Sequence, residues 1–283
     1  MKNSDFCVII LSFWRSDNVQ TYKYLREYGY TWKIYILCSD DDKQLEDYKR
    51  IYGDEVLVFN KDEVFKKIDT VDNFFSKWSP IYARNIIWDF VEKLGYRYFI
   101  MADDDYNEFA YRIPAGNVLK YIKIKNCDKI FLKYFEYLDK TPQIEALAFG
   151  QWGDYIWWVW NSMCRNPKRK LMNLYFLDTK RRFEFKGTLN DDVNTYLYHW
   201  NRGKVFLTPQ VCMIHQAETQ KQWWGITELY LEAWTYAKSF YSVIINPTCV
   251  KIATVWERHK RIHHKIISNK AYPLILSEEC KKA

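Results

Sequence analysis

The chain has 283 residues and is 48% hydrophobic, 27% charged and 19% aromatic, with 9 glycines and 7 prolines. This composition excludes collagen-like, low-complexity and disordered classes, and it supplies enough apolar surface for a sizeable core. The net charge of +7 fits an anionic ligand or partner without requiring one.

The N-terminal part alternates between strand and helix signals. Short apolar runs predict buried strands at Phe6–Trp14, Trp32–Cys38, Glu55–Phe59 and Tyr96–Ala102. Helical spacing between these runs predicts helices at Asn18–Tyr28, Asp42–Tyr52 and Pro80–Leu94, each followed by a glycine. This alternation predicts an α/β fold with a mostly parallel sheet and helices on both faces.

The remainder is less regular. Val118–Leu138 fits either strands or a helix, and Gln151–Asn161 is expected to be extended. Further predictions are strands at Lys204–Leu207 and Val211–Ile214, and helices at Asp191–Trp200, Gly225–Tyr241 and Trp256–Ile267. We expect a single domain over residues 1–283, with a nucleotide-binding half (1–105), an acceptor and metal half (106–220) and a helical extension (221–283).

The sequence also indicates where in the cell the protein is expected to be found. The seven cysteines are scattered singly without a CxxC pair, as in a reduced, cytosolic protein. The apolar run near the N-terminus is too short for a signal peptide, and no stretch approaches the roughly 20 apolar residues that span a bilayer. We therefore expect a soluble, cytoplasmic protein without a membrane partner. The oligomeric state is left open.

An acidic run, Asp103-Asp104-Asp105, directly follows the fourth predicted strand. In open parallel sheets, ligands bind beyond the carboxyl ends of the strands. Carboxylates at that edge suit a hard divalent cation, and Asp103 and Asp105 can reach one site from a turn. The alternative is a solvated turn.

A second acidic run, Asp40-Asp41-Asp42, serves as an internal comparison because it also follows a strand. Capping of the next helix is a sufficient reason for most of this run. We therefore interpret Asp41 and Asp42 as structural, and we keep Asp40, nearest the strand end, as a candidate contact to a nucleotide.

Two arginines are placed to meet a diphosphate. Arg84 lies in the first turn of the helix that precedes the acidic run, and Arg15 follows the first strand. A guanidinium and the free N–H groups of a helix start both bind phosphate oxygens. The alternative for Arg84 is a surface arginine paired with an acid.

The second half adds an acidic pair and a histidine. Asp191 and Asp192 open a predicted helix, where Asp191 can serve as a cap and Asp192 as a general base for an acceptor hydroxyl. His215 ends a predicted strand. A lone histidine there is usually structural, but added to carboxylates it would form a mixed site suited to Mn²⁺.

In this order, the motifs resemble those of GT-A nucleotide-sugar glycosyltransferases, with a DXD-type motif, over about Phe6–Gln216. The resemblance implies a UDP-sugar donor, a Mn²⁺ or Mg²⁺ cofactor and a Rossmann-like N-terminal half. It implies a nucleotide-sugar site formed by Ser12, Trp14, Arg15, Asp40, Arg84, Asp103 and Asp104. It also implies metal ligands Asp103, Asp105 and His215, and catalytic residues Asp192 and Asp191. Inverting members commonly have Glu-Asp where this chain has Asp-Asp, which leaves the base and the stereochemistry open.

More narrowly, the chain resembles phage glycosyltransferases associated with TET-like oxygenases. The resemblance is carried by the run FKGTLNDDVNTY (185–196), the small aromatic-rich domain and the basic C-terminal part. It implies transfer of a hexose to 5-hydroxymethylcytosine or another hydroxymethylated pyrimidine in DNA, in the cytoplasm of a phage-infected host.

Candidate DNA contacts are aromatic and basic residues near the C-terminus, which suit base stacking and phosphate binding. They are Trp223, Trp224, Arg258, Lys260, Arg261 and Lys265. Core packing and a solvated helix face are the alternatives.

Three other functions remain open at this stage. A glycosyltransferase could act on a polysaccharide or protein acceptor. A nucleotidyltransferase or nuclease also uses clustered aspartates, although a nuclease has no need of the Ser12–Arg15 and Arg84 positions. A non-catalytic nucleic-acid-binding protein would leave the acidic run without a role.

Overall fold

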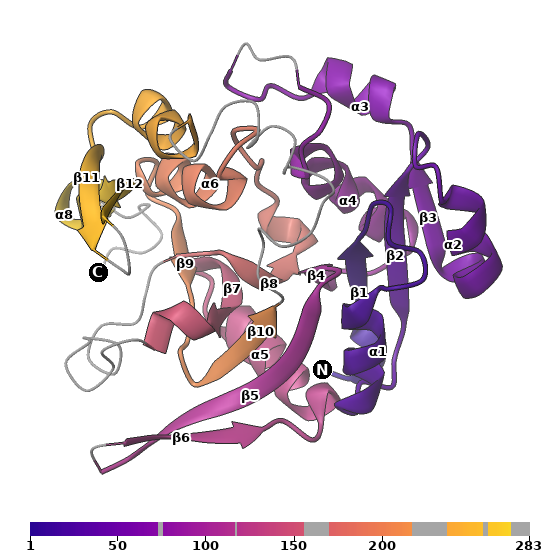
Figure 1. Ribbon diagram of the computed structural model, residues 1–283. Helices are drawn as coiled ribbons and strands as arrows, with labels where there is room; N and C mark the ends of the chain where they lie inside the picture. The colour runs from indigo at the N-terminus through magenta and orange to yellow at the C-terminus, as the bar shows by residue number, and fades with distance from the viewer. Residues whose placement is uncertain (73–75, 117, 156–169, 217–236, 257–259, 273–283) are drawn as a thin grey trace.

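The computed structural model describes residues 1–72, 76–116, 118–155, 170–216, 237–256 and 260–272. One large mixed sheet crosses the molecule, and helices pack on both of its faces (Figure 1). The strand order is β3-β2-β1-β4-β8-β7-β10-β5-β6, with β9 paired to β7. The predicted α/β class is confirmed.

The first four strands form a parallel, Rossmann-like half of the sheet. They are β1 (Phe6–Leu11), β2 (Ile34–Ser39), β3 (Val56–Phe59) and β4 (Tyr98–Asp103). Every residue of β1 is buried, as expected of a strand that is covered on both faces. Leu11 pairs with both Leu37 and Asp103, so the chain leaves β1, β2 and β4 at the same edge of the sheet.

The alternating side chains of β1 feed two apolar clusters, one on each face of the sheet. Phe6, Val8 and Ile10 face one cluster, which α1 (Gln20–Glu27), α2 (Leu45–Tyr52) and α5 (Cys127–Lys140) cover. Cys7, Ile9 and Leu11 face the other, which α3 (Lys61–Lys67), α4 (Ile81–Lys93) and α6 (Asp191–Trp200) cover. The short helix α3 was not predicted.

The second half of the sheet mixes strand directions. It contains β5 (Tyr106–Ala115), β6 (Val118–Lys123), β7 (Ile144–Gln151), β8 (Asn173–Asp178), β9 (Val205–Leu207) and β10 (Cys212–Gln216). The ambiguous stretch Val118–Leu138 divides into β6 and most of α5. The unpredicted strand β8 runs antiparallel to both β4 and β7 and joins the two halves.

Two predictions in the second half need correction. Trp152–Tyr155, expected to be extended, forms the 3-10 helix η3, and residues 156–161 lie outside the described part of the chain. Trp256–Ile267, expected to be helical, instead belongs to an antiparallel hairpin. The hairpin consists of β11 (Val250–Trp256) and β12 (Lys260–Ile266), followed by α8 (Ser268–Ala271).

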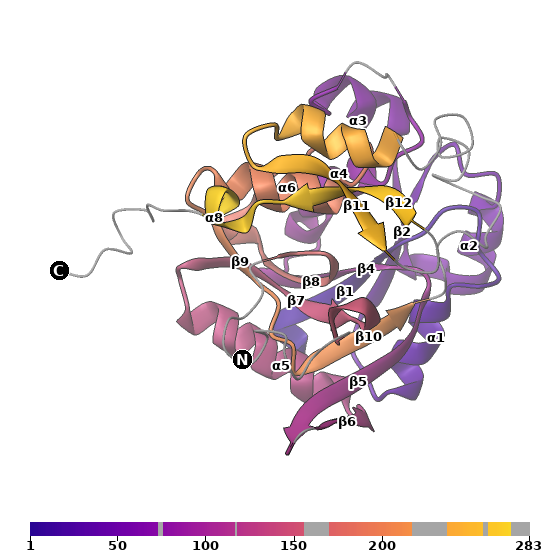
Figure 2. The same ribbon diagram turned by 60° about the vertical axis from the view of Figure 1, so that its left-hand side comes forward.

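The remaining elements are short. Three more 3-10 helices are η1 (Asn3–Asp5), η2 (Gly53–Glu55) and η4 (Thr179–Arg181). Residues 237–245 are helical, and residues 225–236 of the predicted helix lie outside the described ranges. Figure 2 shows the β11–β12 hairpin beside α6 and residues 237–245. Among the described helices, none has the length and apolar character that crossing a membrane requires.

Candidate active site

The loop after β1 is held by the middle aspartate of the acidic run. Asp104 accepts hydrogen bonds from Ser12 Oγ at 2.7 Å and from Arg15 Nη1 at 2.6 Å. Tyr48 Oη lies 2.6 Å from Ser12 Oγ and accepts the N–H of Arg15 at 2.9 Å. Burial raises the pKa of Asp104, while Arg15 and Ser12 oppose that shift. Asp104 therefore positions the predicted nucleotide loop.

The first aspartate of the run meets a buried arginine. Arg84 is 5% exposed, and its Nη2 lies 3.1 Å from Asp103 Oδ1 while its Nε lies 2.7 Å from Asp191 Oδ2. Its guanidinium also lies over the rings of Tyr175 and Phe185, at 5.1 and 5.7 Å. Burial opposes the charge of Arg84, but the negative groups around it outweigh burial and raise its pKa.

Arg84 thus joins two segments that are remote in the sequence. The acidic run ends β4, whereas Asp191 begins α6. Arg84 Nη1 is buried and has no hydrogen-bond partner among the described residues. That N–H group is a donor that a ligand oxygen can satisfy.

The third aspartate has an unsatisfied oxygen. Asp105 Oδ1 is buried and accepts no hydrogen bond from the described residues. Burial, followed by the charges of Asp103 and Asp104, raises the pKa of Asp105 to about 7. Such a carboxylate fits a divalent cation, which would supply the missing partner and favour the ionised form. In the described part of the chain, however, no three His, Cys, Asp or Glu side chains form a metal cluster.

The start of α6 separates its two acids. Asp191 is buried against Arg84, and burial raises its pKa to about 6 although Arg84 opposes the shift. Asp192 is partly exposed, and its Oδ1 accepts the N–H of Val193 at 2.7 Å. No hydrogen bond from the described residues reaches Asp192 Oδ2.

The turn before α6 is tightly packed. Asn190 has a left-handed φ of 50°, and its Nδ2 donates to Lys238 O at 2.7 Å and to Ser242 Oγ at 3.0 Å. Gly187 has a φ of 87°, and its N–H donates to Thr70 O at 3.0 Å. These contacts fix the direction in which α6 begins.

A group of aromatic rings and a lysine lies beside the Ser12–Arg15 loop. The rings of Phe13 and Trp14 stack at 5.0 Å, and Trp78 contacts both edge-on at 6.0 Å. Lys61 Nζ lies 4.6 Å from the ring centre of Phe13 and 4.7 Å from that of Trp78. Trp78 is 44% exposed, so this group is open to a flat ligand.

The second acidic run, Asp40-Asp41-Asp42 after β2, forms hydrogen bonds and an ion pair with nearby residues. Asp40 accepts hydrogen bonds from Asn60 Nδ2 and from the N–H of Lys61, at the start of α3. Asp41 pairs with Lys61 at 2.9 Å. Asp42 accepts the N–H of Trp14 at 2.9 Å, where Trp14 has a left-handed φ of 56°. Asp42 therefore holds the backbone of Trp14 in this conformation.

His215 lies apart from the three aspartates in its contacts. It is exposed, and its Nδ1 lies 2.8 Å from Asn107 Oδ1. It lines a cavity of about 410 Å³ with Tyr24, Glu27, Tyr28, Asn107, Glu108 and Lys123. The structure therefore gathers Asp103, Arg84 and Asp191 through ion pairs, and His215 forms no ion pair with them among the described residues.

Of the six predicted DNA contacts, Lys265 is the one whose side chain is among those that the structure describes. Trp223, Trp224 and Arg258 lie outside the described residues, and so do the side chains of Lys260 and Arg261. Lys265 is exposed on β12, directly opposite Lys251.

Several site residues were missed by sequence reasoning. Tyr48 and Asp42 hold the Ser12–Arg15 loop, Lys61 and Trp78 complete the aromatic group, and Tyr175 lies beneath Arg84. The exposed tryptophan just before Pro80 carried a usable signal, because an indole at a helix start near a nucleotide loop has little packing role. Tyr48 carried none, since its spacing in α2 is that of an ordinary core residue.

Comparison with known proteins assigns the family. A family model described as TET-Associated Glycosyltransferase matches residues 6–225, which include the acidic run and the start of α6. The chain belongs to the TET-associated glycosyltransferase family, and it is accordingly a glycosyltransferase. No curated protein sequence matches it.

Solved structures with a similar arrangement include glucosyl-3-phosphoglycerate synthase from Mycobacterium tuberculosis. Its complex with Mg²⁺ and UDP is 9% identical, with a TM-score of 0.46 over 92% of this chain and 87% of that chain. Its complex with Mn²⁺, UDP and phosphoglyceric acid is 9% identical, with a TM-score of 0.47 over 95% of this chain and 89% of that chain. Family membership rests on the family match alone.

Proposed function

We propose that the protein transfers a sugar from a UDP-sugar to the hydroxymethyl group of a 5-hydroxymethylpyrimidine in DNA, with Mn²⁺ or Mg²⁺ as cofactor. The observation that carries this proposal is the bridge made by Arg84. It brings the acidic run after β4 and the acidic start of α6 to one place. A donor site and a base for the acceptor are thereby adjacent, as sugar transfer requires.

On the donor side, the aromatic group fits a nucleobase and the acidic run fits a cation. Phe13, Trp14 and Trp78 offer ring faces and edges to a flat base, and Arg15 offers a guanidinium to a phosphate. Asp103 and Asp105 would hold the divalent ion, whereas His215, the third ligand that the resemblance implies, is exposed and contacts Asn107. When bound, the ion neutralises charge on the diphosphate leaving group.

On the acceptor side, we assign Asp192 as the general base. Its partly exposed position and available Oδ2 suit removal of the hydroxyl proton, whereas Asp191 is buried and paired with Arg84. The acceptor oxygen then forms a bond to the anomeric carbon while the bond from that carbon to the diphosphate oxygen breaks. UDP leaves, and the proton stays on Asp192. This single displacement inverts the anomeric configuration.

Mass spectrometry of nucleosides tests the reaction. DNA containing hydroxymethylcytosine or hydroxymethyluracil is incubated with the protein, Mn²⁺ and a panel of UDP-sugars. A hexose-sized mass gain on either base supports the proposal. No gain on DNA, together with transfer to a glycan or protein, would replace the acceptor while the donor assignment stands.

The metal and the base are tested separately by variants. We expect Asp105→Asn to abolish the thermal stabilisation by UDP that depends on Mn²⁺, and Asp192→Asn to retain it but lose transfer. Asp47→Asn is the matched control, because it removes an exposed carboxylate of α2 that is paired with Arg50. Unchanged Mn²⁺-dependent stabilisation in Asp105→Asn would contradict the metal assignment, and full transfer by Asp192→Asn would contradict the base.

A further inference from the structure

The hairpin of β5 and β6 carries an arginine with an unusual set of neighbours. Arg112 lies over the rings of Tyr121, Trp152 and Tyr155, at 5.8, 5.2 and 5.1 Å from their centres. It forms no ion pair with the described residues, and its buried Nε has no hydrogen-bond partner among them. Three uncharged rings therefore fix the guanidinium without neutralising it.

The strand register places further groups on the same face as Arg112. Arg112 pairs with Tyr121, and Ala110 pairs with Lys123. Since alternate residues of a strand share a face, Arg112, Tyr121 and Lys123 lie together. Trp152, which is 54% exposed, adds an open indole between Arg112 and His215, whose ring lies 6.5 Å from it.

The hairpin is also basic overall. Between Tyr106 and Lys125 the cationic residues are Arg112, Lys120, Lys123 and Lys125, and the only acidic residue is Glu108. Glu108 pairs with Lys123 at 3.3 Å and faces the same side. Arg112 is therefore the cation on this face without an acidic partner among the described residues, and Lys123, whose side chain is 62% exposed, keeps further N–H donors for a second phosphate. Exposed rings next to an uncompensated arginine are typical of surfaces that bind nucleic acid.

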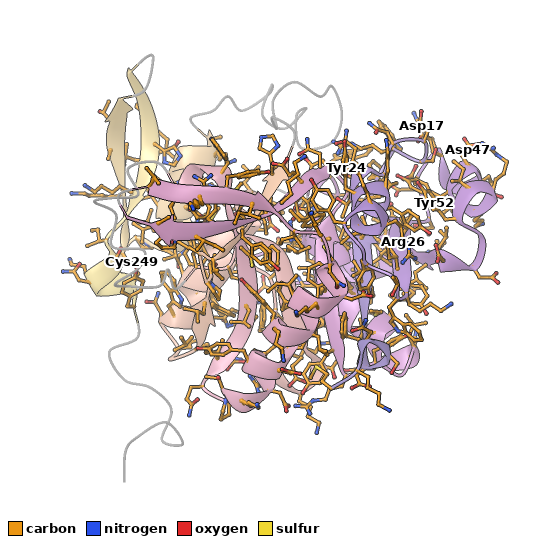
Figure 3. All side chains as sticks on the ribbon, turned by 90° about the horizontal axis from the view of Figure 1, so that it is seen from below. Asp17, Tyr24, Arg26, Asp47, Tyr52 and Cys249 are labelled. Carbon is orange, nitrogen blue, oxygen red and sulfur yellow. The ribbon has the colours of Figure 1, made fainter. Side chains whose placement is uncertain are left out.

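The hairpin leads directly to the acidic run. It projects from the body of the molecule, and Figure 3 shows Tyr24 near its base (Figures 1 and 3). β5 begins at Tyr106, immediately after Asp105. Arg112 is seven residues after Asp105, so an extended strand places it roughly 23 Å from Asp105. At 3.4 Å per nucleotide, this corresponds to about seven nucleotides of DNA.

We propose that the face formed by Arg112, Tyr121, Lys123 and Trp152 binds the phosphodiester backbone of the DNA acceptor, about seven nucleotides from the base that is modified. This inference rests on the proposed function. A two-stranded ribbon is narrow enough to lie in a DNA groove or along one strand. The hairpin lengthens the binding site for the acceptor and leaves the donor site unchanged.

The test is a salt titration of DNA binding by the double variant R112Q/K123Q. Loss of two phosphate contacts is expected to lower the slope of log K against log salt concentration by about 2. The matched control is K49Q/R50Q, which removes one lysine and one arginine from α2, each paired with an acid one turn earlier. These lie near Asp47, at the opposite edge of the molecule from the hairpin (Figure 3).

Two further comparisons sharpen the test. The gain in affinity from a duplex of about 6 base pairs to one of about 20 base pairs is expected to disappear in R112Q/K123Q and to persist in K49Q/R50Q. The single variant K123Q, with an expected slope decrease of about 1, replaces the double variant if that variant does not fold. Hydrolysis of UDP-sugar without an acceptor is expected to stay within twofold of the parent protein.

The outcomes separate this inference from the proposed function. If the parent protein neither binds nor glycosylates hydroxymethylated DNA, the DNA acceptor itself is refuted. If the parent protein glycosylates DNA and R112Q/K123Q keeps the parent salt slope and length dependence, only the role of the hairpin is refuted. A lower slope in both the hairpin variant and the α2 control would show a general charge effect and would also refute it.

Discussion

Arg84 is the residue on which the geometry of the candidate site depends. The positive charge of its guanidinium is shared between Asp103 and Asp191, at 3.1 and 2.7 Å. Because burial disfavours an isolated ion, removing one partner from a buried ionic cluster costs far more than removing an exposed charge. Here, removal of the arginine leaves two carboxylates without their shared cation.

We expect Arg84→Gln to lower the free energy of unfolding by about 3–5 kcal/mol and to abolish transfer. Arg84→Lys keeps the charge but cannot span both acids with separate nitrogens, so it should recover stability more than activity. Urea denaturation and a transfer assay measure the two effects. Arg182→Gln is the control, since the side chains of Arg182 and its partner Asp89 are 43% and 42% exposed. Equal losses in the two Gln variants would contradict the bridging role.

The sequence predicted the relative positions of individual residues correctly where the order of strands and helices alone determines them. Arg84 and Asp103 were expected on the same edge of the sheet, and the structure places them in contact. The sequence did not reveal that Asp191 would share the guanidinium. That contact depends on how α6 is directed onto the sheet, and no local pattern encodes that direction.

At the level of elements, the turn before α6 sets the position of the proposed base. Gly187 has a φ of 87°, and a Cβ there would lie 2.7 Å from Asn194 Nδ2 and 3.0 Å from a ring carbon of Tyr241. Asn194 Nδ2 in turn donates to Leu189 O at 2.8 Å. A side chain at Gly187 would therefore disturb both the turn and the first turn of α6.

Gly187→Ala is expected to destabilise the protein by about 2 kcal/mol or more, because backbone strain and a steric clash add. Gly95→Ala is the matched control, with a φ of 79° and nothing within 4 Å of the added Cβ, and it should show the backbone cost alone. Thermal and chemical unfolding compare the two. Equal destabilisation by the two substitutions would mean that the turn before α6 accommodates the added Cβ without a steric penalty.

The helix α6 also carries a histidine, His199, whose protonation is expected to change the stability of the protein with pH. His199 is buried, its Nε2 lies 2.8 Å from Glu184 O, and burial lowers its pKa from 6.5 to about 4. Lys186, Arg202 and Lys204 add to the decrease. Between pH 4 and 6.5 the unfolded chain thus binds more protons at this position than the folded chain.

The stability contributed by neutral His199 should be complete above pH 6.5 and lost as the pH falls toward 4, by up to about 3 kcal/mol. Asp105 and Asp191, whose pKa values are raised, act in the opposite direction over part of this range. The difference between the parent protein and His199→Gln isolates the histidine. A difference in unfolding free energy that stays constant from pH 7 to pH 4 would contradict the assignment.

The elements also show why some sequence patterns misled. The basic stretch after Trp256 suggested a charged helix, yet Ile262 and Ile266 are four residues apart on one face of β12 and the cation Lys265 lies on the other, in the period of a strand. β8 was missed because its residues form a continuous buried run that fits strand or helix equally well. Burial on both faces removes the periodicity that would distinguish the two.

For the molecule as a whole, the parallel half of the sheet was the predictable part. Four apolar runs separated by helices of ordinary length leave few topologies open, and the observed order β3-β2-β1-β4 is among them. The mixed half depends on pairings between distant segments, such as the antiparallel pairing of β10 with β5 and its parallel pairing with β7. Those pairings are set by packing between layers, which a single sequence does not display.

The double role of Arg84 makes the affinities of the two proposed substrates interdependent. A divalent ion on Asp103 would compete with the guanidinium for that carboxylate and leave Arg84 more fully to Asp191. By thermodynamic linkage, the factor by which UDP and Mn²⁺ change the affinity for DNA must equal the factor by which DNA changes theirs. We expect this factor to exceed about 5 in the parent protein and to approach 1 in Arg84→Lys, as titrations in both orders would measure. Because the guanidinium of Arg84 couples the two sites, the protein is expected to bind DNA more weakly when its donor site is empty. This would limit DNA binding that cannot lead to sugar transfer.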